Sequence, residues 1–131
     1  MRTAQCHMPQ RQVVLPNEPT SARAARQFLQ QASCPEHMAR VLDDAQLLVS
    51  ELVGNAIRYG LPPIEVAVRC VGEACLEVRV RDTGVDPPVA VRQAAPDAEG
   101  GRGLQLVDLL SSAWGTEADS FGKTVWFRLD M

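Results

Sequence analysis

The sequence predicts an α/β two-layer sandwich, in which about three helices pack on one face of a mixed, mostly antiparallel sheet. Two patterns carry this prediction. Apolar residues recur at steps of three and four over residues 36–59, which is typical of an amphipathic helix. Apolar and polar residues alternate over 64–70 and again over 76–81, which indicates two strands that each bury one face.

The expected elements are separated by residues that interrupt regular structure. Pro16 ends the first strand, and Gly60 with Pro62-Pro63 ends the long helix, because proline cannot continue a helix. Gly72-Glu73 joins two strands into a hairpin, and in the last strand we expect Trp126 to pack in the core. The segments are, in order, a strand over 12–15, a helix over 20–32, a helix over 36–59, strands over 64–70 and 76–81, a loop or lid over 85–101, a helix over 104–112, and strands over 114–117 and 123–129.

The composition is that of an ordinary soluble domain. The chain has 131 residues, of which 46% are hydrophobic and 22% charged, so we expect a flexible tail over 1–11 and a single domain over 12–131. The net charge of −3 argues against direct binding of nucleic acid by bulk electrostatics. No apolar run suits a membrane span or a signal peptide, so we expect a cytoplasmic protein that binds no membrane.

Four cysteines, at positions 6, 34, 70 and 75, form no Cys-x-x-Cys pair. Free thiols are therefore the expectation, as in a reducing compartment. A cross-strand disulfide between Cys70 and Cys75, which flank the expected hairpin turn, stays open as an alternative.

The long helix carries a glutamate and an asparagine four residues apart. At about 100° per residue, Glu51, Asn55 and Arg58 fall within roughly 60° of one another, at the border of the apolar arc. A carboxylate and an amide placed there can point into a cleft between helix and sheet. An ordinary polar helix edge would show the same pattern.

A second motif, Asp82-x-Gly84, stands where a strand ends. A carboxylate only accepts hydrogen bonds, so Asp82 can take the exocyclic amine of adenine and reject the carbonyl of guanine. Gly84 has no Cβ, which lets the backbone approach a flat ring closely. The alternative is a polar turn, in which Asp-x-Gly is common.

Two further motifs lie near the C-terminus. Glycines around Arg102, at positions 101 and 103, can aim backbone N–H groups at an anion before a helix, and the guanidinium can add a bidentate phosphate contact. A flexible loop before a helix is the alternative. In the last strand, Thr124 would place a hydroxyl near the floor of the cleft, although a simple hairpin strand would also fit.

The order of these motifs resembles that in the ATP-binding domain of the GHKL superfamily, which includes gyrase, heat-shock chaperone, histidine kinase and mismatch-repair ATPases. The resemblance is closest to small bacterial anti-sigma factors that are also serine-protein kinases, and it spans about residues 12–130. It implies the Bergerat ATP-binding fold with ATP and Mg²⁺ as cofactors. The motifs that carry it are Ser50–Arg58, Asp82-Thr83-Gly84 with Pro87-Pro88, Gly101-Arg102-Gly103-Leu104, and Gly122-Lys123-Thr124-Val125-Trp126.

The resemblance also implies residue roles. Glu51 would be the general base that acts on a substrate hydroxyl or on water, and Asn55 would hold the Mg²⁺ that bridges the phosphates. Asp82 would bind adenine, Gly84 would line its pocket, and Thr124 would support the adenine end through water. The remaining nucleotide-binding positions would be Arg58, Gly101, Arg102, Gly103 and Leu104.

The partners that the resemblance implies are a sigma factor and an anti-sigma antagonist of the STAS type, on which a serine would be phosphorylated. Homodimerisation stays open. Two alternatives remain: a non-catalytic module that binds its partner in an ATP-dependent way, and an orphan catalytic domain of the histidine-kinase type.

Overall fold

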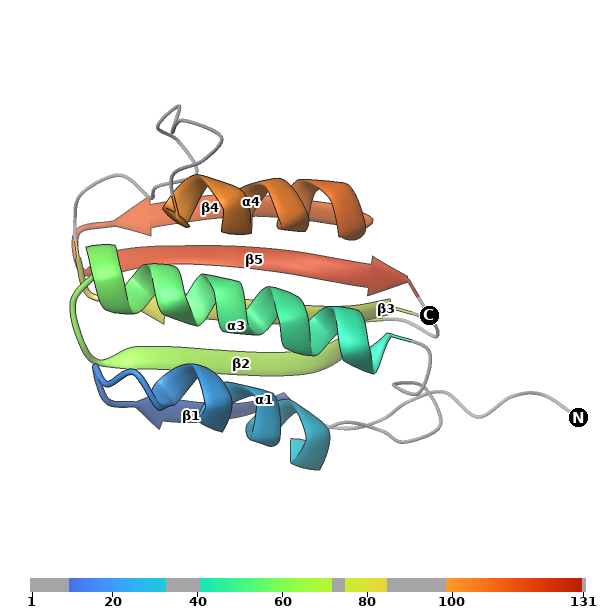
Figure 1. Cartoon of the computed structure of the whole chain (residues 1–131), viewed down its shortest axis with the longest axis horizontal. Coiled ribbons are helices and arrows are strands. Elements are labelled where there is room, and N and C mark those ends of the chain that lie inside the picture. Colours follow the sequence, from blue (N-terminus) through green and yellow to red (C-terminus); the bar gives the residue numbers. More distant parts are fainter. Residues whose placement is uncertain (1–9, 33–40, 72–74, 85–98, 131) are drawn as a thin grey trace, which may run out of the picture.

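The computed structural model describes residues 10–32, 41–71, 75–84 and 99–130, and every structural statement below concerns these residues. Five strands form one sheet in the order β1-β2-β3-β5-β4, and all four pairings are antiparallel. Three helices lie side by side on one face of this sheet (Figure 1), which confirms the predicted two-layer architecture. The elements are β1 (Arg11–Leu15), α1 (Ser21–Ala32), α3 (Leu42–Tyr59), β2 (Ile64–Val71), β3 (Cys75–Asp82), α4 (Glu99–Leu110), β4 (Ala113–Asp119) and β5 (Gly122–Asp130).

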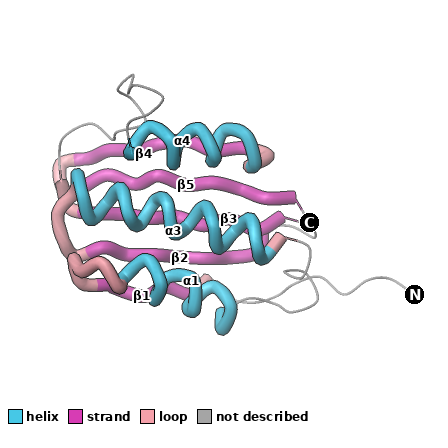
Figure 2. Tube along the Cα trace, in the orientation of Figure 1, coloured by secondary structure: helices cyan, strands magenta, loops and turns pink. Residues whose placement is uncertain are grey.

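The core lies between the helices and the sheet. Helix α3 runs across the middle of the layer, with α1 on one side and α4 on the other (Figure 2). Its apolar side chains Leu48, Val49 and Val53 are wholly buried, as are the sheet residues Val78 and Phe127. Side chains alternate between the two faces along a strand. The face that carries the buried residues Val78 and Phe127 is therefore the one that contacts the helices, and it is called the helix face below. None of the described helices is long and apolar enough to cross a membrane.

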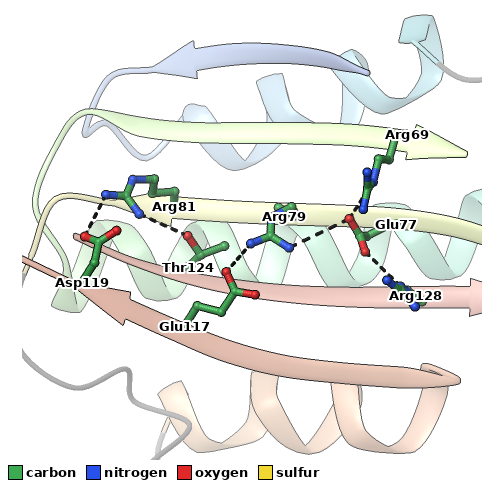
Figure 3. A network of polar contacts seen from close by, with 8 residues as sticks. All are labelled: Arg69, Glu77, Arg79, Arg81, Glu117, Asp119, Thr124 and Arg128. Atoms are coloured by element: carbon green, nitrogen blue, oxygen red, sulfur yellow. Dashed lines mark hydrogen bonds and ion pairs between the residues drawn. The ribbon is translucent and has the colours of Figure 1, made fainter. Parts of the chain in front are cut away.

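The opposite face of the sheet, called the polar face below, carries a network of charged side chains (Figure 3). Glu77 is at its centre with a side chain only 1% exposed. Its carboxylate accepts hydrogen bonds from Nε of Arg69 and Nε of Arg128, each at 2.9 Å. Burial by itself would raise the pKa of Glu77, but the bonds from Arg128 and Arg69 outweigh it and lower that pKa.

Some boundaries differ from the prediction. Helix α3 begins at Leu42, and Val41 precedes it as the N-cap with φ −120° and ψ 3°, whereas the expected start at Glu36 falls outside the described residues. Helix α4 begins at Glu99 and not at Leu104, so the end of the expected lid is helical. Strand β1 begins at Arg11, which was expected to belong to the tail. The rest of the tail and lid lie outside the described residues.

The hairpin of β2 and β3 is formed as predicted, with Val66 opposite Val80 and Val68 opposite Val78. No disulfide joins Cys70 to Cys75. Burial raises the pKa of the Cys75 thiol, and the nearby Asp130 carboxylate adds to this effect. The expectation of thiols is therefore confirmed for this pair, whereas Cys6 and Cys34 lie outside the described residues.

Candidate functional site

Two predicted site residues, Asp82 and Gly84, lie together at one end of the sandwich. Helix α3 and strand β3 both end there, while α4 and β5 both begin there (left in Figure 1). Gly60 directly follows α3, and Asp82 is the last residue of β3. The strand register places Lys123 of β5 directly opposite Asp82. Residues more than sixty positions apart thus form one polar cluster.

The Asp82 side chain is only 8% exposed, and one of its two oxygens is occupied by the protein. Oδ1 accepts a hydrogen bond from the Gly84 N–H at 2.7 Å, a second from Lys123 Nζ at 3.1 Å, and a long one from the Leu61 N–H at 3.4 Å. No described residue donates a hydrogen bond to Oδ2. A buried acceptor without a donor is costly, so Oδ2 is a suitable acceptor for a ligand.

Two glycines make room for this cluster. A Cβ added to Gly60 would lie 2.5 Å from Cγ of Asp82 and 2.6 Å from Oδ2. A Cβ added to Gly84 would lie 2.7 Å from Nζ of Lys123. The chain after α3 and the chain after β3 therefore approach the ion pair more closely than any residue with a side chain would allow.

The side chains of Glu51 and Asn55 project from one edge of α3. The other edge contacts α1. The Arg26 guanidinium donates to Oγ of Ser50 at 2.9 Å, and the side-chain amide of Gln46 donates to the backbone carbonyl of Arg26 at 3.1 Å. At about 100° per residue, Glu51 and Asn55 lie on the edge away from α1, which is the edge beside α4. Both residues are half-buried, whereas Arg58, one turn further on, is exposed.

The glycine motif lies in the first turns of α4, at positions 100–103. The first four N–H groups of a helix have no partner within it, so the backbone at Gly100 and Gly101 can still face an anion, whereas the N–H of Gly103 lies within the helical hydrogen-bond ladder. The roles of the Arg102 side chain and of the glycines at 101 and 103 stay predictions. Leu104 is 9% exposed and its side chain belongs to the hydrophobic core.

Thr124 does not have the place that the sequence suggested. It is paired with Arg81 in the strand register, so its side chain lies on the polar face, behind the sheet from Asp82. Its hydroxyl accepts a long hydrogen bond of 3.5 Å from Arg81 (Figure 3), and it borders a shallow depression with Glu65 and Arg79. The expected contact of Thr124 with the adenine end is therefore corrected.

Lys123 is the site residue that sequence reasoning missed. Trp126 shows the same shift as Thr124, since it lies half-buried on the polar face, next to Gly115 and under Arg128, and not in the core. Residues four apart in a strand lie on the same face of the sheet. Phe127 is wholly buried on the helix face, so Lys123 lies on the helix face as well.

The donor set fits a Mg²⁺-nucleotide. The described residues hold no group of three or more His, Cys, Asp or Glu that would bind a metal alone. Mg²⁺ in phosphoryl-transfer sites is commonly held by one or two side-chain oxygens together with the phosphates, and Asn55 can supply such an oxygen from the edge of α3. Oδ2 of Asp82, to which no described residue donates, has the acceptor character that the amine of adenine requires.

The comparisons with known proteins agree with this geometry. The family model for the histidine kinase-like ATPase domain matches residues 15–129. The chain therefore belongs to the family of histidine kinase-like ATPase domains. No curated protein matches it.

Among solved structures, the chain is similar to the RsbU and RsbW domains of Rv1364c from Mycobacterium tuberculosis. The TM-score is 0.66 with 20% sequence identity, and the match covers 93% of this chain but 32% of that one. This chain thus spans about a third of its neighbour's length, and the likeness supports the fold.

Proposed function

We propose that this protein is an ATP-binding regulator of the anti-sigma serine-kinase type, which binds a sigma factor and phosphorylates a serine of a STAS-type antagonist. The observation that carries the nucleotide site is that Oδ2 of buried Asp82, beside Gly60 and Gly84, accepts no hydrogen bond from any described residue. Membership of the ATPase-domain family supports ATP as the ligand. The RsbW domain named in the structural neighbour supports the regulatory role.

In this proposal, Asn55 serves nucleotide binding and Glu51 serves the chemical step. Asn55 would supply an amide oxygen to the Mg²⁺ that accompanies ATP, and that ion would supply charge neutralisation for the phosphates. Glu51, one turn earlier on the same edge of α3, accepts the proton of the attacking serine hydroxyl. Phosphoryl transfer depends mainly on such positioning and charge neutralisation. The side chains of Asn55 and Glu51 and the backbone at the start of α4 are therefore the kinds of group that this reaction needs.

The test compares Asn55→Ala and Glu51→Ala with Asp43→Ala, which removes an exposed carboxylate from the first turn of the same helix. Asn55→Ala should weaken binding of Mg·ATP more than binding of metal-free ATP. Glu51→Ala should leave ATP binding nearly intact and slow phosphoserine formation by ~10²–10⁴-fold, as expected for loss of a general base. Asp43→Ala should change neither.

The measurements are calorimetry with ATP, and mapping of phosphoserine on candidate antagonists incubated with labelled ATP. Wild-type protein that binds ATP and a partner but never yields phosphoserine would defeat the kinase proposal and leave an ATP-dependent binding module. A phosphohistidine product would instead indicate a catalytic domain of the histidine-kinase type.

A further inference from the structure

Thr83, the residue directly after β3, ties the end of that strand to the segment that follows α3. Its backbone N–H donates to the carbonyl of Leu61 at 3.0 Å, and its hydroxyl donates to the carbonyl of Pro62 at 2.7 Å. A hydroxyl has one hydrogen to donate, so the Thr83 side chain spends its donor on the protein's own backbone. The two bonds together fix residues 60–62 against the end of the sheet.

The segment that Thr83 holds is the one that contacts Asp82. The Leu61 N–H donates a long hydrogen bond of 3.4 Å to Oδ1 of Asp82, and a Cβ added to Gly60 would lie 2.6 Å from Oδ2. Oδ1 thus has Leu61 as a third donor besides the Gly84 N–H and the lysine ammonium, whereas no described residue donates to Oδ2. The place of this segment therefore helps to set which way the carboxylate faces.

We propose that Thr83 is a positioning residue for the adenine base, which acts through Leu61 and Gly60 to hold the Asp82 carboxylate in its binding orientation. The inference rests on the nucleotide site proposed above, and it adds a residue to which the sequence motifs gave no role. A carboxylate that the protein has already oriented loses less freedom when a ligand binds, so such preorganisation raises affinity.

The experiment measures the dissociation constant of ADP by calorimetry for the wild type and three variants. Thr83→Val keeps the shape of the side chain and removes its hydroxyl, so the constant should rise by about three- to tenfold, the equivalent of one hydrogen bond. Thr83→Ser keeps the hydroxyl and should restore the wild-type constant. Thr116→Val is the matched control, since that half-buried threonine of β4 makes no side-chain hydrogen bond to the described part of the chain, and it should change nothing.

Titrations without Mg²⁺ show at which end of the nucleotide the effect lies. Thr83 acts at Asp82, whereas Asn55 would act through the metal. Thr83→Val should therefore lose the same factor in affinity with and without Mg²⁺, while Asn55→Ala should lose affinity mainly when Mg²⁺ is present. A loss in Thr83→Val that is confined to Mg·ADP would place its effect at the phosphates and overturn the inference.

A further variant separates positioning from a purely structural role. Leu129→Val shortens a buried side chain near the end of β5, far from Lys123, and should lower the free energy of unfolding while it leaves the ADP constant unchanged. If Thr83→Val loses stability in urea but binds ADP as tightly as the wild type, Thr83 is only structural and the inference falls. Thr83→Ser that binds as weakly as Thr83→Val would also overturn it.

The proposed function and the role of Thr83 fail differently. If the wild type binds no ADP, the nucleotide site itself is wrong, and the role of Thr83 falls with it. If the wild type binds ADP and Thr83→Val binds it equally well, the nucleotide site stands and the role of Thr83 alone falls.

Discussion

The carboxylate of Asp82 lies so close to the α-carbon of Gly60 that a methyl group at position 60 would overlap it. All three carboxylate atoms would be within 2.7 Å of the added Cβ. The carboxylate cannot simply turn away, since Oδ1 is held by the Gly84 N–H and by Lys123. The side chain at position 60 therefore decides whether Asp82 keeps its place.

Gly60→Ala should lower the free energy of unfolding by about 1–3 kcal/mol, the usual cost of overpacking, and should weaken nucleotide binding because Asp82 is displaced. Gly54→Ala, within α3, is the matched control, since its Cβ would meet nothing within 4 Å. It should stabilise the protein by about 0.5–1 kcal/mol, as alanine favours a helix over glycine. Urea unfolding of both variants checks the pair, and equal stability of the two would contradict the packing argument.

Glu77 gives the stability a dependence on acid pH. Its pKa in the folded protein is below the usual value of 4.5, because the bonds from Arg128 and Arg69 outweigh the effect of burial. The unfolded chain therefore binds a proton more readily than the folded one, so stability rises with pH in this window. The contribution is complete above the usual pKa and is lost as the pH falls through the folded pKa.

Replacing Glu77 with Gln should remove this part of the pH dependence. The variant should be less stable than the wild type at neutral pH, and the difference should shrink as the pH falls below about 4.5, where the wild-type carboxylate begins to take up a proton. Chemical unfolding at a series of pH values measures it. A difference that stays constant from neutral to acid pH would show that the ion pairs of Glu77 contribute nothing.

Among the elements, β5 shows what the sequence does not determine. Apolar residues follow one another at 125–127 and polar ones at 123–124, so strict alternation is lost and either face could be assigned to the core. The pairing with β3 settles the question, because Asp82 and Lys123 are opposite each other and share a face. Strands β2 and β3 alternate clearly, and their hairpin was predicted correctly.

Phe127→Ala should therefore cost about 3–5 kcal/mol of unfolding free energy, as expected for a wholly buried aromatic residue. Trp126→Ala, its neighbour on the polar face, should cost less, since that ring is only half-buried. Thermal and urea unfolding of the two variants provide the comparison. A larger loss for Trp126→Ala would mean that the strand presents its other face to the helices.

Helix α4 differs from the prediction for a related reason. Its first turns contain three glycines, at positions 100, 101 and 103, and glycine has a low helix propensity, so the sequence favours a loop there. In the protein, Leu104 and Val107 bury the following turn against the core. Propensity is a weak guide where such packing holds an element in place.

For the whole molecule, the site is an assembly of segments that are far apart in the chain. Periodicity predicted the helices and the hairpin, and the order of motifs pointed to Asp82 and Gly84. Sequence periodicity alone could not bring Lys123 to Asp82, because that contact depends on the sheet order β3-β5. The contact of Gly60 with Asp82 depends in the same way on how α3 crosses the sheet.

Binding at this junction should stabilise the molecule as a unit, since ligands that bind only the folded state raise its stability. With free Mg·ATP at 100 times its dissociation constant, the gain should be about 2.7 kcal/mol. Thermal unfolding with and without Mg·ATP measures it, and Gly60→Ala should show a smaller rise in melting temperature. An unchanged melting temperature at millimolar Mg·ATP would argue against the nucleotide site.

The single lysine also allows the rate at which β5 leaves the sheet to be measured by proteolysis. A protease that cuts only after lysine has one target in this chain, the bond between Lys123 and Thr124, which lies in a strand flanked on both sides by β3 and β4. The protease cannot reach this bond until β5 leaves the sheet. The rate of cleavage therefore reports how often the native protein opens at β5. Ligands that bind at the proposed nucleotide site should therefore slow the cleavage.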